Sequence, residues 1–383
     1  MQTFDVAVVG GGVIGSSIAF ELAGEKLRVA LFDRQQPGQE SSWAAAGMLS
    51  PGPDASDEES LVPLSHESFK LYPQFISSIE SASGRPTYFA RQGTLHAFFG
   101  PHAEAESEKM SAAYRRAGLP LELISVQDAR RLEASLGTSA RSAAWLPEEG
   151  VVDPRILIEA LLAASRSRGV EIRADSPVTS IVRQGARCEG VVAGGKKVSA
   201  GCVVVAAGSF TGGIDWLARY APTRPVRGQM VAMRGLSPGI RHVMRCEKGY
   251  VVPRMDGRII AGSTLEDAGF SKHVTPGGIS KILEAALELV HGLAHAEIIE
   301  TWAGLRPGTP DNLPILGPTD IEGLFLATGH YRNGILLAPI TARLLREWVL
   351  GKPVQLDTRI FSALRFAEAQ SNRTGSKAAS AVP

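Results

Sequence analysis

The sequence predicts an α/β protein in which a parallel-sheet domain is interleaved with an α+β domain built on an antiparallel sheet. Two observations predict this class. Short, nearly continuous apolar runs at 4–9, 28–32 and 202–208 are typical of parallel strands that are buried on both faces. From Pro222 the apolar residues alternate instead, as in antiparallel strands. We therefore expect the chain to leave the parallel-sheet domain after its second strand and to return near Val170.

Composition and charge indicate an ordinary globular protein. The 383 residues are 44% hydrophobic and 21% charged, with a formal net charge of +1, so nothing favours nucleic acid or an anionic membrane as a partner. The chain shows no signal-peptide pattern and no stretch of ~18 apolar residues. Its 3 cysteines form no CxxC pair, which disfavours disulfides and a zinc site. We expect a cytoplasmic protein with no membrane span and no metal.

The first strand, at 4–9, runs directly into the spacing G-x-G-x-x-G at Gly10, Gly12 and Gly15. The first glycine permits a tight turn, the second lets a pyrophosphate approach the backbone, and the third allows the helix to pack closely on the strand. A helical pattern continues to about Gly24, so its first-turn N–H groups would face the pyrophosphate. An isolated triplet would be weak support, because glycine is common.

A second strand, at 28–32, ends in Asp33, which is placed to accept hydrogen bonds from an adenosine ribose. This order of strand, glycines, helix, strand and acid predicts a dinucleotide, and Asp33 argues against a 2′-phosphate, but neither separates FAD from NAD. The separating feature is the small-residue loop SSWAAAGML at 41–49, whose backbone can lie against a large planar ring. The alternative is a helix start capped by Ser41 or Ser42, and both interpretations can hold together.

Further elements follow from the same patterns. A polar turn is expected at Lys196–Lys197, a loop over 145–154, and a tight hairpin at Asp256–Gly257. Cys202, inside an apolar run, is interpreted as core filler. Helices are expected at 60–79, 101–116, 154–168 and 334–350, and strands at 88–99, 169–173, 178–182, 188–192, 229–233, 249–254 and 259–262.

Two late segments carry a resemblance to a known family. WAGLRPGTPD at 302–311 and GHYRNGILLAP at 329–339, with the N-terminal glycines, resemble the D-amino-acid oxidase superfamily of FAD-dependent oxidoreductases, and within it the glycine oxidases of thiamine thiazole biosynthesis. The match extends to about Gly351, nearly the whole chain. It implies a glutathione-reductase-type FAD fold, whose Rossmann-like FAD-binding domain is interleaved with an antiparallel-sheet α+β substrate domain. We place the FAD-binding domain at 1–85, 150–220 and 320–366, the substrate-binding domain at 86–149 and 221–319, and a disordered tail at 367–383.

The resemblance also implies which residues contact FAD and substrate. Arg306 and Arg332 would bind the substrate carboxylate, Tyr250 would donate a further hydrogen bond, and Met48 would line the same cavity. An arginine fork suits a carboxylate, because it offers two parallel charge-assisted hydrogen bonds. The FAD site would comprise Gly10, Gly12, Val13, Ile14, Gly15, Asp33, Arg34, Ser41, Ser42, Ala46, Gly47, Met48, Val178, Gly208, His330, Tyr331, Arg332, Asn333, Gly334, Ile335 and Leu336.

Several of these assignments have plain alternatives. Arg306 could be a surface ion-pair residue, Arg332 could present only its backbone, and Tyr250 could be ordinary core. His330 is expected to be structural.

The helix that opens at Gly334 would stabilise the anion that forms at the flavin N1–C2 edge on reduction.

The implied reaction is the oxidation of glycine or another small amine, such as sarcosine or D-alanine, by hydride transfer from the alpha carbon to flavin N5. The imine would supply thiazole synthesis or hydrolyse to a 2-oxo acid and ammonia, and oxygen would reoxidise the flavin to give hydrogen peroxide. No cysteine follows Cys246, so we expect noncovalent FAD. A homotetramer rests on the resemblance alone. The alternatives are a D-amino-acid dehydrogenase that uses a quinone or another acceptor, and a flavin-containing tRNA-modifying or structural protein, which the near-zero charge disfavours.

Overall fold

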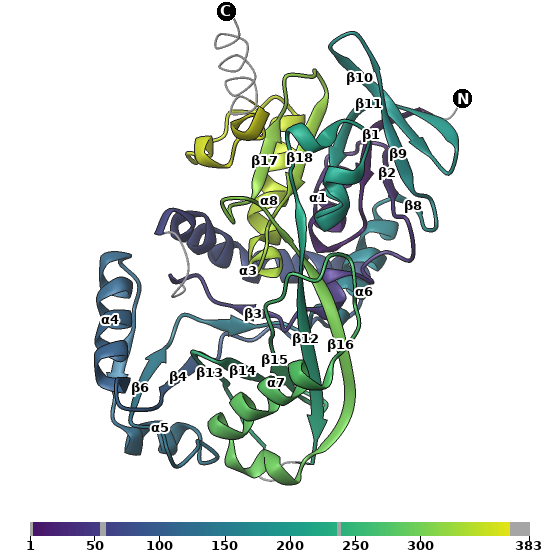
Figure 1. The fold of residues 1–383 in the computed structure, drawn as a ribbon. Coiled ribbons are helices and arrows are strands. Elements are labelled where there is room, and N and C mark those ends of the chain that lie inside the picture. The colour runs from purple at the N-terminus through teal and green to yellow at the C-terminus, as the bar shows by residue number, and fades with distance from the viewer. Residues whose placement is uncertain (1–2, 54–58, 236–238, 368–383) are drawn as a thin grey trace, which may run out of the picture.

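A computed structural model describes residues 3–53, 59–235 and 239–367, and most of its strands form two large sheets (Figure 1). The strands of the first sheet are β1 (Thr3–Val9), β2 (Val29–Phe32), β8 (Glu171–Arg173), β9 (Val178–Gln184), β10 (Arg187–Ala193), β11 (Lys196–Val205), β17 (Ile315–Pro318) and β18 (Leu324–Thr328). Their order is β17-β18-β11-β1-β2-β8, and the antiparallel strands β10 and β9 extend from β11.

The centre of the first sheet is parallel and covered on both faces. β1 pairs in parallel with β2 and β11, so that Val9 lies beside Phe32 and Val205. Val6 and Val8 pack with α1 (Val13–Gly24), α3 (Val62–Ser83), α6 (Pro154–Ser167) and α8 (Gly334–Val349), whereas the alternate side chains of β1 pack with residues of β9–β11 and of the segment 214–221. Because successive side chains point to opposite faces of a strand, cover on both sides explains the continuous apolar run.

The second sheet is mainly antiparallel and carries the other half of the site. Its order is β16-β12-β15-β14-β13-β4-β6-β5, and the long pair β12–β16 sets Arg224 beside Gly308 at one end and Arg234 beside Glu297 at the other. Its strands are β4 (Thr94–Phe98), β5 (Glu122–Ile124), β6 (Ser142–Leu146), β12 (Arg224–Arg234), β13 (Val243–Cys246), β14 (Gly249–Pro253), β15 (Ile259–Gly262) and β16 (Glu297–Gly308).

Helices and a short ladder complete the arrangement. α7 (Pro276–Leu289) packs on the second sheet, and α4 (Ala103–Arg116) and α5 (Val126–Leu132) lie beside β5 and β6. The two-stranded ladder of β3 (Met48–Leu49) and β7 (Gly150–Val151) lies between the two large sheets (Figure 1). Across the described ranges, no helix is both long and apolar enough to cross a membrane.

The predicted fold class is confirmed, with two local corrections. Lys196 and Lys197 are not a turn but begin β11; the turn lies at Gly194 and Gly195, with φ of 55° and 76°. Two consecutive positive φ angles favour glycine, which the polar lysines obscured in the sequence. The predicted loop at 145–154 is also wrong in part, since β6 ends at Leu146 and β7 follows at Gly150–Val151.

Other boundaries shift by a few residues. The predicted strand at 88–99 is reduced to β4, with Ala90 making one bridge to Val151. The helix expected from residue 60 begins at Val62 and runs on to Ser83. The hairpin at Asp256–Gly257 is confirmed, because it joins the antiparallel strands β14 and β15. The predicted disordered tail lies, from residue 368 on, outside the described residues.

Candidate active site

The turn between β1 and α1 has no room for side chains at two of its three glycines. A Cβ at Gly10, where φ is 101°, would lie 2.4 Å from the carbonyl oxygen of Ala206. A Cβ at Gly15 would lie 1.8 Å from the carbonyl oxygen of Gly10. Gly12 is the N-cap of α1 and contributes no capping side chain. Gly10 and Gly15 therefore allow the tight turn and the close packing of α1 that the spacing predicts.

The first turn of α1 presents backbone donors at the same place. The hydroxyl of Ser42 accepts the N–H of Val13 at 2.9 Å and keeps its own proton available for donation. In the part of the chain that the structure describes, no acceptor bonds the N–H groups of Ile14 and Gly15. Backbone donors at a helix N-terminus fit the pyrophosphate of a dinucleotide.

Asp33 lies at the end of β2, beside the glycine turn. Its carboxylate accepts the N–H of Gly11 at 2.7 Å and that of Gln35 at 3.0 Å. Burial raises the pKa of Asp33, and these two backbone hydrogen bonds act against the rise. Its carbonyl accepts the N–H of Ser176 at 2.7 Å, so the segment that leads into Val178 runs alongside. Asp33 therefore lies beside the segment that leads into Val178.

Arg34 follows Asp33, and its side chain contacts Phe210 and Glu40. Its guanidinium lies 3.4 Å from the centroid of the Phe210 ring and is ion-paired with Glu40 at 2.5 Å. A guanidinium stacked on an aromatic ring is held in one orientation.

The small-residue segment after β2 is both a short helix and a loop. α2 (Ser41–Ala44) begins after Glu40, which makes no side-chain cap. Neither serine caps α2, which corrects that alternative: Ser42 bonds α1, and the hydroxyl of Ser41 donates to the carbonyl of Leu305. Ala46 and Gly47 follow the helix, and Met48 begins β3 opposite Val151.

Gly47 is required by its conformation. Its φ is 80°, and a Cβ would lie 2.0 Å from the carbonyl oxygen of Val152. The N–H of Val152 donates to the carbonyl of Gly47 at 3.0 Å. The loop therefore runs close to the N-terminus of α6.

The segment 330–336 lies between the two sheets. His330 is buried, and its Nε2 lies 3.0 Å from the hydroxyl of Thr341. Burial lowers the pKa of His330 to about 3, so this side chain is neutral at pH 7. The N–H of Tyr331 donates to the carbonyl of Pro307 at 3.1 Å, which ties this segment to the strand that carries Arg306.

The N-terminus of α8 is formed by backbone rather than by a side-chain cap. Asn333 is the N-cap residue and makes no side-chain cap, and Gly334 begins the helix. Pro339 lies inside the helix and cannot donate to the carbonyl of Ile335. The hydroxyl of Tyr72 supplies that bond instead, at 2.6 Å.

Two more predicted residues lie close to this segment. The carbonyl of Gly208 accepts the hydroxyl of Thr328 at 3.1 Å, at the end of β18. The carbonyl of Leu336 accepts the hydroxyl of Ser68 at 2.6 Å. Strands β11 and β18 are thus tied together where the chain turns toward α8.

Arg306 is partly buried near the end of β16 and is held from the second sheet. Its Nη1 donates to the carbonyl of Thr264 at 3.2 Å, and its Nη2 to the hydroxyl of Ser263 at 2.5 Å. No carboxylate of the described residues forms an ion pair with it, so the structure gives no support to a surface ion pair. Burial lowers the pKa of Arg306; Tyr250 acts against this and Arg332 adds to it, so all three side chains lie within electrostatic reach.

Tyr250 stands on β14 and is partly buried. Its hydroxyl lies 3.5 Å from the sulfur of Met230, and a Cβ at Gly262 would lie 2.8 Å from that hydroxyl. Arg332 is exposed in the turn before α8. Tyr250 on β14 therefore lies near Arg306 on β16, and Arg332 lies within electrostatic reach of Arg306.

Sequence reasoning missed the residues that hold Arg306. Ser263 and Thr264 also line a cavity of about 490 Å³, together with Lys248. Gly228 leaves room for the guanidinium, since a Cβ there would lie 2.2 Å from Nη1. A glycine inside a strand pattern often marks such a close approach, and that signal was present at Gly228.

Comparisons with known proteins agree with this geometry. The family described as FAD dependent oxidoreductase matches residues 5–348. The chain is 35% identical over 354 residues to the bifunctional protein ThiO/ThiG of Trichormus variabilis, a match that covers 91% of this chain and 53% of that protein. It is 32% identical over 372 residues to the glycine oxidase of Geobacillus kaustophilus, covering 94% of this chain and 97% of that protein.

A solved structure gives the same result. The crystal structure of glycine oxidase from Geobacillus kaustophilus matches with a TM-score of 0.91 and 31% sequence identity, over 95% of this chain and 99% of that chain. The chain spans about half the length of the bifunctional relative and nearly all of the glycine oxidase. It belongs to the DAO family of FAD-dependent oxidoreductases, and its cofactor is FAD.

Proposed function

We propose that this protein is an oxidase of glycine and other small amines, including sarcosine and D-alanine. The observation that supports the proposal is that Arg306, on β16, lies within electrostatic reach of Tyr250, on β14, and of Arg332, in the turn before α8. Relatives named glycine oxidase support it, at 32% identity over nearly their whole length.

The cradle would hold FAD through backbone groups. The first turn of α1 and the hydroxyl of Ser42 suit the pyrophosphate, and Asp33 suits the ribose. The segment 46–48 and the stretch 330–336 would contact the flavin ring. We propose that FAD is bound noncovalently. In support, the three cysteines, Cys188, Cys202 and Cys246, are buried or partly buried and lie outside these segments.

The side chains of this protein bind and orient the amine. Arg306 and Arg332 would hold its carboxylate, and Tyr250 would donate a further hydrogen bond. A partly buried guanidinium binds a carboxylate more strongly than an exposed one, because water competes less. FAD, when bound, would supply the acceptor for a hydride from the alpha carbon. The chain's task is to hold that carbon within about 3–3.5 Å of the acceptor.

No side chain of the described site is arranged to remove a proton. His330, the histidine of this segment, is neutral and bonded to Thr341. A neutral amine needs no such base, because its lone pair assists departure of the hydride. The imine product would supply thiazole synthesis or hydrolyse to a 2-oxo acid and ammonia, with oxygen reduced to hydrogen peroxide. The bifunctional ThiO/ThiG relative supports the link to thiazole synthesis, although the chain spans about half of it.

The domain boundaries predicted from the sequence also remain a proposal. Strands of the first sheet come from 3–32, 171–205 and 315–328, and those of the second from 94–146 and 224–308, which supports the interleaved division. A homotetramer is proposed from the resemblance, and a cytoplasmic location from the cysteine pattern.

An oxygen-consumption screen on purified protein tests the function. The substrates are glycine, sarcosine, D-alanine, D-proline and N-ethylglycine, with peroxide assayed in parallel. We expect anaerobic bleaching of the flavin by glycine and peroxide formation in air. Bleaching without peroxide would instead favour a dehydrogenase with another acceptor. Absence of bleaching with all five amines would overturn the proposal.

A further inference from the structure

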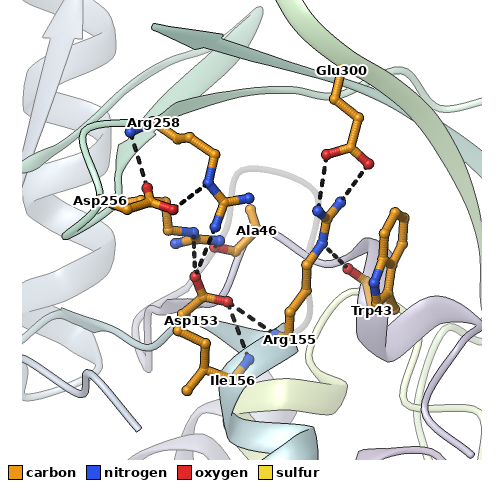
Figure 2. A network of polar contacts seen from close by, with 9 residues as sticks. Trp43, Ala46, Asp153, Arg155, Ile156, Asp256, Arg258 and Glu300 are labelled. Carbon is orange, nitrogen blue, oxygen red and sulfur yellow. Dashed lines mark hydrogen bonds and ion pairs between the residues drawn. The ribbon is translucent and has the colours of Figure 1, made fainter. Parts of the chain in front are cut away.

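The carbonyl groups of residues 43–47, the end of α2 and the loop after it, are held by donors from the rest of the chain. Figure 2 shows one of these bonds, from Arg155 on α6 to the carbonyl of Trp43. The bonds are Arg155 Nε to Trp43 O at 3.4 Å, Trp302 Nε1 to Ala44 O at 3.1 Å, Arg254 Nη2 to Ala46 O at 2.7 Å, and Val152 N to Gly47 O at 3.0 Å.

This pattern fixes where the adjacent N–H groups point. In a trans peptide the C=O of one residue and the N–H of the next point in opposite directions. Because the carbonyls of Ala44 and Ala46 are held from the second sheet, the N–H groups of Ala45 and Gly47 face the other way. Neither N–H finds an acceptor within the described ranges. The segment therefore offers two fixed donors on the side away from the sheet.

Arg254 makes the shortest of these side-chain bonds and is deeply buried. Its side chain is 6% exposed, and its Nε lies 3.4 Å from Oδ2 of Asp153, which is 7% exposed. Burial lowers the pKa of Arg254 to about 10, so it is charged at pH 7. Its Nη1 is buried and has no acceptor within the described residues. A buried donor without a partner lowers stability.

We propose that Arg254 is a positioning residue for the flavin, which orients the segment 45–48 so that its free N–H groups meet acceptor atoms of the isoalloxazine edge. The inference rests on the proposed contact between this segment and FAD. Arg254 lies four positions after Tyr250, and Tyr250 belongs to β14, which ends at Pro253. The stretch 250–254 thus carries both Arg254, which would orient the segment 45–48, and Tyr250, which would donate a hydrogen bond to the substrate.

Arg155 has a different role in the same network. It forms a two-point ion pair with Glu300, at 2.9 and 3.1 Å, and lies 3.5 Å from the centroid of the Trp43 ring. Asp153 caps α6 by accepting the N–H groups of Arg155 and Ile156. Changes at these residues would disturb helix packing, so they do not isolate the loop.

Arg258 provides the matched control. Its Nη2 lies 3.6 Å from the same Oδ2 of Asp153, and its Nε bonds Asp256 at 2.7 Å. Within the described residues, Arg258 donates no hydrogen bond to the segment 45–48. Arg258→Met therefore removes a cation beside Asp153 and leaves the bond to Ala46 in place.

The experiment compares Arg254→Met, Arg254→Lys and Arg258→Met with the wild type. FAD affinity is measured by titrating apoprotein with FAD, and the bound flavin by its absorption spectrum and reduction potential. For Arg254→Met we expect at least a tenfold higher Kd for FAD, a shifted spectrum and a more negative potential. For Arg258→Met we expect a Kd within twofold of the wild type and an unchanged spectrum.

Arg254→Lys keeps the charge beside Asp153 but cannot contact Asp153 and the carbonyl of Ala46 at the same time. We expect at least a threefold higher Kd for FAD. If Arg254→Met does not fold, this variant decides the question. A wild-type Kd and spectrum in every Arg254 variant that folds would overturn the inference, as would an equal effect in Arg258→Met. Failure of the wild type itself to bind FAD would overturn the proposed function instead.

Discussion

The proposed cofactor cradle and the proposed carboxylate clamp are built in contrasting ways. The cradle uses backbone: Gly10 and Gly15 give up side chains so that helix N–H groups can approach a phosphate. The clamp uses side chains, Arg306 and Tyr250, on strands whose alignment depends on β12 and β15 between them. Added side-chain volume should therefore weaken cofactor binding at the cradle, whereas loss of a polar side chain should weaken substrate binding at the clamp.

The largest expected effect comes from adding one methyl group to the cradle. In Gly15→Ala the new Cβ would lie 1.8 Å from the carbonyl oxygen of Gly10, so the turn must open. We expect the Kd for FAD to rise at least about 100-fold, on the order of 3 kcal/mol. Fluorescence titration of the apoprotein measures it.

The control adds the same methyl group where there is space. A Cβ at Gly213 meets nothing within 4 Å, and its φ is not in the left-handed region. Gly213→Ala should bind FAD like the wild type. Equal affinities for the Gly15 and Gly213 variants would contradict the backbone role of the cradle.

The second effect removes the clamp and leaves the cradle intact. Arg306→Ala should lower kcat/KM for glycine about 100-fold, close to 3 kcal/mol, mainly through KM. FAD content should stay at the wild-type level. Arg224→Ala, on the adjoining strand at an exposed position, is the control and should keep wild-type kinetics. Unchanged affinity and turnover in Arg306→Ala would remove this residue from the site.

The same contrast explains how much could be predicted from sequence. The cradle is contiguous, and the spacing of Gly10, Gly12 and Gly15 with Asp33 is sufficient to predict it. The clamp came from family resemblance, because nothing local to Arg306 indicates what holds it. Ser263 and Thr264 reach it only through strand register, and a single sequence does not specify the register of segments 42 and 43 positions apart.

The contact that Arg254 makes with Ala46 could not be predicted from the local sequence either. The sequence context of Arg254, the end of an alternating strand, is typical of an exposed cation, yet its side chain is 6% exposed and bonds Ala46. The contact spans 208 positions. Local pattern predicted the strand and gave no signal for the burial of the residue that follows it.

The third effect uses acidity and compares His330, which is buried before α8, with His96, which is partly buried on β4 of the second sheet. Burial lowers the pKa of both His330 and His96 to about 3 from the ordinary 6.5. Between those values the unfolded chain binds a proton that the folded chain does not, so stability falls as pH falls below 6.5. Below pH 6.5 each histidine should lower the free energy of unfolding by about 1.4 kcal/mol per pH unit, or by roughly 2 kcal/mol in total at pH 5.

Urea unfolding of the wild type, His96→Gln and His330→Gln between pH 7 and 5 measures this. Each substitution should reduce the slope of unfolding free energy against pH by about 1.4 kcal/mol per unit. Slopes identical to the wild type in both variants would show that neither histidine is held neutral in the fold.

The smallest effect removes one hydroxyl from the clamp. Tyr250→Phe keeps the ring on β14 and should lower kcat/KM for glycine about fivefold to tenfold, near 1 kcal/mol, because one hydrogen bond is lost. The Kd for FAD should not change, in contrast to Gly15→Ala. Tyr88→Phe is the control, since Tyr88 is 46% exposed and should keep wild-type kinetics. If Tyr250→Phe weakened FAD and left glycine kinetics intact, Tyr250 would belong to the cradle and the division between backbone and side-chain roles would fail there.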